Sequence, residues 1–371
     1  MAHRDYYERP RGGRRQQQNR RKIILAAVIL VIVLAAAAAY IWYLRRDSYQ
    51  TGRLQAAEES TAADVYNTVS RPDPASAGGE SDVYAEEEDD GLIWYDGKSY
   101  RYNGHLSNYL LMGVDTKGNI NQERDWQNKG GGQADVIYLL SYDRKEESLR
   151  VFVLPRDTMT TVMVADTAGN IVLEEERQLC LQYAYGDGKR RSCEMMCDAV
   201  SYLLFGVPLS GYASINLDSL PVLSDVLGGV TVTLPDDSMT DVNPEWKKGT
   251  VITLDRNNSE KFLRYRNKQV ELSAWARLNR QKVFVKAFAG QLRKRQKEDA
   301  GTVTHAFETL KPFMVTNMGN DIFLDLALAE QIGDNTTIPG EDVTTDNWDE
   351  FHVDQKALYS MIIEAFYTPA G

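Results

Sequence analysis

Three apolar runs decide the fold: YLLMGV at residues 109–114, VIYLLS at residues 136–141 and LRVFVL at residues 149–154. Each run has the length of a β-strand, and two of them are nearly continuous hydrophobics. Such runs are typical of central strands that are buried on both faces of a sheet. We therefore expect a sheet built around these three strands.

Further elements surround this centre. The alternating residues 93–102 predict a hairpin around Asp96-Gly97, a pair that favours a tight turn. Helices are predicted at residues 194–205, 217–227, 259–266, 278–294 and 356–366, and strands at 230–234 and 251–254. Because strands and helices mix along residues 91–371, we predict an α/β fold, a layered domain with a central mixed β-sheet flanked by helices.

The beginning of the chain predicts a membrane anchor before this domain. Residues 1–22 hold eight Lys or Arg and two acids, and residues 23–44 carry no charge, which suits a helix across a bilayer. A cleaved signal peptide is the alternative, but Arg45 and Arg46 follow where a small-residue cleavage site would stand. The positive-inside rule then predicts a single-pass protein of the cell membrane with a cytoplasmic tail and an extracellular domain.

Residues 45–90 have a different composition, rich in Ala, Ser, Glu and Asp, with an acidic run at 86–90. Such a segment buries too little apolar surface to hold one conformation. We predict an acidic, disordered extracellular stalk between the transmembrane helix and the domain.

Composition excludes several classes of function. The 371 residues carry a formal net charge of −11, so a nucleic-acid partner is not expected. The four His and three Cys form no zinc motif, and the signatures GxSxG and SxxK of serine enzymes do not occur.

Charged side chains stand at the ends of the three central runs. Asp115 follows the first run, Asp135 precedes the second, and Arg156 and Asp157 follow the third. Two carboxylates that converge need a cation or a proton between them, and Mg²⁺ takes one or two carboxylates together with phosphate oxygens. The alternative is that each acid caps a turn or a helix.

A second cluster is basic. Arg264 and Arg266 lie two residues apart, and Arg277 and Arg280 lie three apart on one predicted helical face. The planar guanidinium matches phosphate oxygens, so this cluster indicates a polyanionic ligand such as pyrophosphate. Ordinary surface salt bridges are the alternative.

Taken together, these segments resemble the LytR-CpsA-Psr proteins of Gram-positive cell envelopes, from about residue 106 to residue 288. The resemblance rests on six motifs in the family's order: LMGVD at 111–115, ADVIYLL at 134–140, LPRDT at 154–158, DVLGGV at 225–230, FLRYR at 262–266 and RLNRQ at 277–281. The basic tail, single anchor and acidic stalk match the family's architecture as well.

The resemblance implies a phosphotransferase of cell wall assembly that moves a glycopolymer, such as teichoic acid or capsular polysaccharide, from a polyprenyl-pyrophosphate carrier onto peptidoglycan. By position, it implies Asp115 and Asp135 as Mg²⁺ ligands, and as pyrophosphate contacts Arg156, Arg264, Arg266, Arg277, Arg280 and Gln281. It also implies an apolar channel for the lipid. Two departures are Ala134, where the family commonly has a basic residue, and residues 273–276, where it commonly has an aspartate.

The charges also suggest a mechanism. Attack on phosphorus by a sugar hydroxyl develops negative charge, which Mg²⁺ and Arg156 would stabilise. No histidine is placed to act as the base, so Asp115 or Asp157 is the candidate proton acceptor. Two other functions fit the same residues: a phosphatase or pyrophosphatase of the lipid-linked glycan, and a non-catalytic protein that binds an envelope component.

Overall fold

The computed structural model of the chain describes residues 92–120, 132–166, 170–267, 269, 273–345 and 349–370. The predicted tail, transmembrane helix and stalk at 1–22, 23–44 and 45–90 lie outside these residues. Within the described part, no helix has the length and apolar character needed to cross a membrane.

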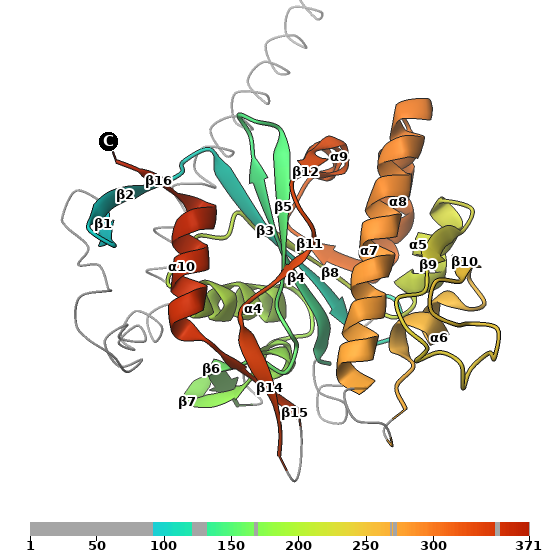
Figure 1. Cartoon of the computed structure of the whole chain (residues 1–371), viewed down its shortest axis with the longest axis horizontal. Helices are drawn as coiled ribbons and strands as arrows, with labels where there is room; N and C mark the ends of the chain where they lie inside the picture. Colours follow the sequence, from blue (N-terminus) through green and yellow to red (C-terminus); the bar gives the residue numbers. More distant parts are fainter. Residues whose placement is uncertain are drawn as a thin grey trace, which may run out of the picture. The chain divides into compact units, whose positions relative to one another are not determined.

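A seven-stranded mixed sheet forms the centre of the domain (Figure 1). Its strands β3, β4 and β5 are the three apolar runs, joined in chain order as antiparallel neighbours. Strand β8 adds in parallel to β3, β11 runs antiparallel to β8, and β12 and β13 both run parallel to β5. The bounds are β3 (Leu106–Val114), β4 (Ala134–Asp143), β5 (Ser148–Val153), β8 (Gly211–Ile215), β11 (Met314–Thr316), β12 (Glu330–Gln331) and β13 (Thr336–Thr337).

This topology brings four strand ends to one edge of the sheet. Strands β3 and β8 end there, β4 begins there, and β5 ends there because it runs antiparallel to β4. The chain segments that follow Val114 and Val153 and precede Ala134 therefore lie close together. This edge carries the charged residues discussed below.

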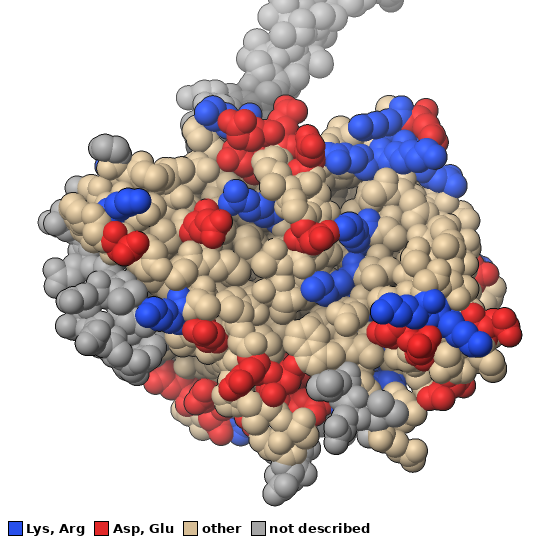
Figure 2. Space-filling model, in the orientation of Figure 1, with Lys and Arg blue, Asp and Glu red and all other residues tan. Residues whose placement is uncertain are grey.

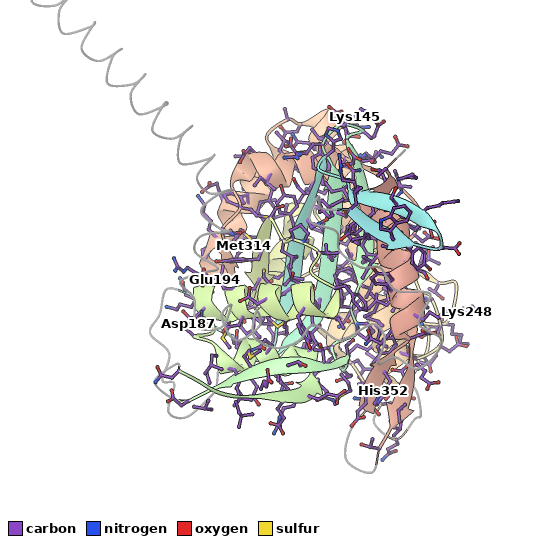
Figure 3. The ribbon with its side chains drawn as sticks, turned by 90° about the vertical axis from the view of Figure 1, so that its left-hand side faces the viewer. Lys145, Asp187, Glu194, Lys248, Met314 and His352 are labelled. Carbon is purple, nitrogen blue, oxygen red and sulfur yellow. The ribbon has the colours of Figure 1, made fainter. Side chains whose placement is uncertain are left out.

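One face of the sheet is filled by a conventional apolar core. Helices α4 and α10 pack on it, and α4 crosses the strands in Figure 3. Buried Leu110, Ile137 and Leu139 of the sheet meet Met196 of α4 and Phe366 of α10. The bounds of the elements on this side are α4 (Arg190–Leu203), α10 (Gln355–Phe366), the 3₁₀ segment η2 (Leu179–Tyr185) and the hairpin β6 (Met159–Ala165) and β7 (Ile171–Gln178).

The opposite face is covered by helices from the second half of the chain. The long helix α7 lies beside α8 and α9, and α5 contacts α8. Side chains from these helices stand over β3 and β4 and leave a cavity between helices and sheet. The bounds are α5 (Ser219–Val226), α7 (Ser273–Glu298), α8 (Thr302–Leu310), η3 (Lys311–Phe313) and α9 (Asn320–Leu328).

Three small units complete the domain. A lobe around buried Phe262 contains β9 (Val230–Thr233), β10 (Val251–Leu254) and α6 (Ser259–Arg264). A three-stranded sheet pairs β1 (Leu92–Tyr95) and β2 (Lys98–Tyr102) with β16 (Tyr367–Pro369). The hairpin of β14 (Gly340–Thr344) and β15 (Asp349–Val353) lies near the charged edge of the central sheet.

The predicted mixed α/β fold is confirmed, as are the three central strands. The hairpin turn at Asp96 and Gly97 also forms, with φ values of 50° and 71° that suit a type I′ turn. Helix α7 begins at Ser273, five residues before its predicted start. The hairpin β6–β7 was not predicted, because β7 carries Glu174-Glu175-Glu176 on an exposed ribbon without apolar alternation.

The packed face of the sheet yields a stability prediction. Leu110→Ala empties a fully buried site in β3, so the free energy of unfolding should fall by about 2 to 5 kcal/mol. Val251→Thr, at a residue that is 63% exposed on β10, is the control and should change it by less than about 0.5 kcal/mol. Urea denaturation compares the two variants, and equal losses would contradict the assigned core.

Candidate functional site

Arg156 is the centre of the charged edge. Its guanidinium donates to Asp135 of β4, to Asp157 Oδ1 (Nε, 3.1 Å) and to Gln133 Oε1 (Nη2, 2.7 Å). Nη2 also lies 3.2 Å from the Sγ atom of buried Cys180 in η2. Burial alone would lower the pKa of Arg156, but the negative groups around it raise the pKa, so this arginine is held as a cation. Arg156 thus joins the beginning of β4 to the end of β5.

Asp115 lies at the same edge, directly after β3. Its Oδ1 accepts a hydrogen bond from the backbone N–H of Gln133 at 2.6 Å. Gly132 has a φ of +83°, and a Cβ there would lie 2.2 Å from Thr116 Cγ2 and 3.0 Å from Asp115 Oδ1. The chain can approach Asp115 this closely because residue 132 is glycine.

Arg277 faces the same charges from α7. It is half-buried in a small polar pocket whose lining includes Asp135, Arg156 and Asp157. Burial lowers the pKa of Arg277, and repulsion from Arg156 and Arg266 lowers it further. With the residues that the structure describes, Arg277 forms no hydrogen bond or ion pair. A partly buried cation without such a partner is costly unless an anion accompanies it, so this pocket suits an anionic ligand.

The other predicted basic residues are placed differently. Arg264 lines the large cavity and pairs with Glu260 Oε1 at 2.9 Å, and Arg266 pairs with Asp349 of β15. Arg280 is 1% exposed and donates to the backbone oxygens of Phe262 and Tyr265. Gln281 lines both the cavity and the polar pocket. The structure therefore brings Arg156, Arg277 and Gln281 together. It directs the side chain of Arg280 into the lobe around Phe262, and the predicted contact of Arg280 with phosphate stays a prediction.

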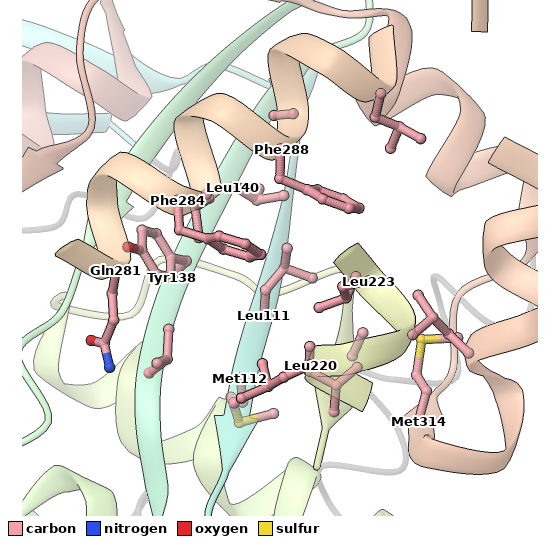
Figure 4. Close-up of a pocket in the computed structure, with 18 of the residues that line it drawn as sticks. Leu111, Met112, Tyr138, Leu140, Leu220, Leu223, Gln281, Phe284, Phe288 and Met314 are labelled. Carbon is pink, nitrogen blue, oxygen red and sulfur yellow. The ribbon is translucent and has the colours of Figure 1, made fainter. Parts of the chain in front are cut away.

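An apolar cavity of about 320 Å³ adjoins the polar pocket, and the two share Asp135, Val136, Tyr138 and Gln281. Figure 4 shows Phe284 and Phe288 of α7 and Leu220 and Leu223 of α5 projecting over Leu111 of β3. Tyr138 is 2% exposed, and its hydroxyl has no hydrogen-bond partner among the described residues. The apolar cavity and the polar pocket together form two adjoining compartments, one apolar and one charged.

Several residues of the site carried no recognisable signal in the sequence. Trp275 and Asp342 line the polar pocket, and Asp349, which pairs with Arg266, acts electrostatically on Asp342. Asp342 and Asp349 belong to short strands of the β14–β15 hairpin, far along the chain from the other residues. The three cysteines are free and buried, and burial raises the pKa of the Cys180 thiol to about 11.

No group of three or more His, Cys, Asp or Glu side chains suited to a metal ion occurs in the described part of the chain. Asp115 and Asp135 supply two carboxylates at one edge, and Asp115 acts electrostatically on the Arg156 that binds Asp135. This donor set fits Mg²⁺ in the mode in which the ion takes its remaining ligands from water and from substrate phosphates.

A family model described as the LytR_cpsA_psr family matches residues 60–365, most of the chain. The chain belongs to the LytR-CpsA-Psr family. Among solved structures, a protein of Streptococcus agalactiae has a TM-score of 0.55 and 20% identity, covering 71% of this chain and 91% of that one. Bacillus subtilis TagV has a TM-score of 0.51 and 19% identity, covering 71% and 97%. These two structures share the fold of the LytR-CpsA-Psr domain described here.

A curated relative is the polyisoprenyl-teichoic acid–peptidoglycan teichoic acid transferase TagU of Halalkalibacterium halodurans. It is 31% identical over 123 residues, which are 33% of this chain and 33% of the relative. The chain thus spans about a third of the length of this curated relative.

Arg277 yields a prediction that separates binding from stability. Arg277→Gln should lower the affinity for inorganic pyrophosphate by about tenfold or more, because a charge-assisted bond to phosphate contributes roughly 1.5 to 3 kcal/mol. The same change should raise the melting temperature of the ligand-free protein, since it removes a partly buried cation that is repelled by Arg156.

Calorimetric titration and thermal melting measure the two effects. Arg256→Gln is the control, because Arg256 is exposed and pairs with Asp225 outside the site. Unchanged pyrophosphate affinity in Arg277→Gln would contradict an anion site at Arg277.

Proposed function

We propose that this protein transfers a glycopolymer from a polyprenyl-pyrophosphate carrier onto peptidoglycan, as an enzyme of cell-envelope assembly. The single observation that carries the proposal is the half-buried Arg277, which has no ion pair among the described residues and lies beside Arg156 in a polar pocket that adjoins an apolar cavity. A ligand that fits both compartments has a hydrocarbon tail and a strongly anionic head. The relative TagU is named as a transferase of polyisoprenyl-linked teichoic acid, which supports this ligand class and reaction.

The cavity suits the prenyl chain for a simple energetic reason. Its walls are aliphatic and aromatic side chains of β3, β4, α5, α7 and α8, so burying hydrocarbon there gains roughly 25 cal/mol per Å². Gln281, Arg264 and Asp135 lie at its boundary. The lipid would therefore be oriented with its pyrophosphate toward Arg156 and Arg277.

The reaction class follows from these charges. Arg156 and Arg277 would hold the pyrophosphate and stabilise the negative charge that develops when an acceptor hydroxyl attacks the glycan-side phosphorus. Mg²⁺, held by Asp115 and Asp135, would supply further charge stabilisation when bound. Asp157 would keep Arg156 oriented through the 3.1 Å contact with its Nε. The polyprenyl phosphate would leave.

We place the enzyme at the cell membrane, with residues 23–44 as a single-pass anchor and the catalytic domain outside. The proposed substrates support this location, since the lipid carrier lies in the membrane and peptidoglycan lies beyond it. Protease added to intact cells should digest the domain and spare the tail.

Purified protein in detergent, supplied with polyprenyl-pyrophosphate glycan and peptidoglycan oligomers, tests the proposed reaction. Mass spectrometry of the products should show the glycan joined to peptidoglycan through a phosphodiester, together with free polyprenyl phosphate. Release of free glycan phosphate without a peptidoglycan-linked product would instead identify a hydrolase.

The cavity makes a separate prediction. Ala306→Phe introduces a bulky ring at a buried position of α8 that lines the cavity, so affinity for polyprenyl pyrophosphate should fall. Affinity for inorganic pyrophosphate should not change, because the polar pocket is untouched. Ala300→Phe, at an exposed position after α7, is the matched control. Equal affinity of wild type and Ala306→Phe for the lipid would contradict this use of the cavity.

The metal proposal predicts a loss of Mg²⁺ response. Ligand binding stabilises the folded state, so Mg²⁺ added with inorganic pyrophosphate should raise the melting temperature of the wild type beyond the effect of pyrophosphate alone. Asp115→Asn should lose this extra increase while remaining folded. Asp225→Asn, on α5, should keep it. A full Mg²⁺ response in Asp115→Asn would contradict the assignment of that carboxylate.

A further inference from the structure

The polar pocket contains a carboxylate that the proposed pyrophosphate site does not use. Asp342 of β14 lines this pocket with Arg156, Asp157, Trp275 and Arg277. Two other lining acids, Asp135 and Asp157, are occupied by hydrogen bonds from Arg156. Asp342 forms no side-chain hydrogen bond or ion pair with any residue in the described ranges. Asp342 therefore has both carboxylate oxygens available to a bound molecule within the described part of the chain, whereas Asp135 and Asp157 each share one oxygen with Arg156.

The hairpin directs Asp342 toward the site. Its partner across the hairpin is Phe351 of β15, which is 1% exposed in the core below, so this face of the hairpin points inward. Asp349 lies on the same face and pairs with Arg266. Glu350 and His352, which contact each other at 2.7 Å, lie on the opposite face.

We propose that Asp342 is the general base that takes the proton from the acceptor sugar hydroxyl. This inference rests on the proposed function and assigns the proton transfer to a residue other than Asp115 and Asp157, the candidates that the sequence offers. Asp157 is less suited to be the base because it pairs with Arg156. Asp115 accepts a backbone N–H and is one of the two proposed Mg²⁺ ligands. Asp342 lies beside the arginines that would hold the phosphate, so an acceptor entering between them meets a free carboxylate.

The acceptor oxygen forms a bond to the glycan-side phosphorus as its O–H bond breaks, and the proton moves to the Asp342 carboxylate. The bond from that phosphorus to the bridging oxygen breaks, and its electron pair leaves with the polyprenyl phosphate. Because Asp342 is exposed, it returns the proton to solvent.

The electrostatics suit this role. Partial burial and the charges of Asp157 and Asp349 raise the pKa of Asp342 from 3.8 to about 6. Arg156 and Arg277 line the same pocket. A base with a pKa near the working pH is a better proton acceptor than an ordinary aspartate and is still ionised at neutral pH.

The test compares Asp342→Asn with Glu341→Gln, its neighbour on β14, whose exposed side chain points to the opposite face. Asp342→Asn should reduce the rate constant for transfer by roughly 100-fold to 10,000-fold, the usual contribution of a general base. Its affinity for polyprenyl pyrophosphate should be unchanged or higher, because a negative charge near the head group is removed. Glu341→Gln should match the wild type in both measurements.

The pH dependence gives a readout that a merely structural role would not produce. The wild-type transfer rate should rise as the pH passes through about 6, Asp342→Glu should retain a rising limb, and Asp342→Asn should lose it. The raised pKa also means that ionisation of Asp342 costs folding stability. Asp342→Asn should therefore melt at a higher temperature than the wild type at pH 7, and the difference should vanish below about pH 4.

Three outcomes would overturn either the role of Asp342 or the proposed function. If the wild type transfers the glycan and Asp342→Asn is equally fast and keeps the rising limb of the pH profile, Asp342 is not the base, and the proposed function still stands. A parallel loss of lipid affinity and rate would likewise overturn the assignment of Asp342 as the base and make it a binding residue. Hydrolysis without transfer by the wild type would overturn the proposed function, and with it the sugar hydroxyl as the proton donor.

Discussion

The hydrogen bonds of Arg156 are the constraint on which the charged edge depends. One guanidinium binds the acid at the start of β4, the acid that follows β5, the amide of Gln133 and the sulfur of Cys180. These groups come from three separate segments, and without this cation two carboxylates would repel each other in a half-buried pocket. Arg277 then enters the pocket from α7 and forms no ion pair with the residues that the structure describes. The pocket suits an anion because Arg277 keeps its donors available to a ligand, although Asp135, Asp157 and Asp342 also line the pocket.

In the proposed function, the apolar cavity would give this charged pocket its selectivity. A phosphate alone would fit the arginines, and the cavity beside Tyr138 and Gln281 would favour a ligand with attached hydrocarbon. The two compartments are built from different parts of the chain. The sheet supplies the acids and one wall, whereas α5, α7 and α8 supply the opposite wall. Binding energy from the tail can thereby hold the pyrophosphate in the geometry that the arginines require.

The sequence predicted the centre of the fold because the apolar runs of β3, β4 and β5 fit buried strands better than any other kind of secondary structure. It also predicted that Asp115, Asp135 and Arg156 stand at strand ends, since each directly borders such a run. It could not predict the direction of Arg280, because spacing of three residues from Arg277 indicates a shared face but not the backbone carbonyls of the neighbouring lobe. Asp342 and Trp275 reach the pocket only through tertiary packing, which leaves no local pattern.

A crystal structure of the domain with a bound polyprenyl pyrophosphate would test the proposed use of both compartments. We expect phosphate oxygens within hydrogen-bond distance of the Arg156 and Arg277 guanidiniums, and the prenyl chain between α7 and the sheet against Phe284 and Leu111. Asp342 should face the glycan-side phosphate from the solvent side. Pyrophosphate bound elsewhere, or a prenyl chain lying outside the cavity, would contradict the account.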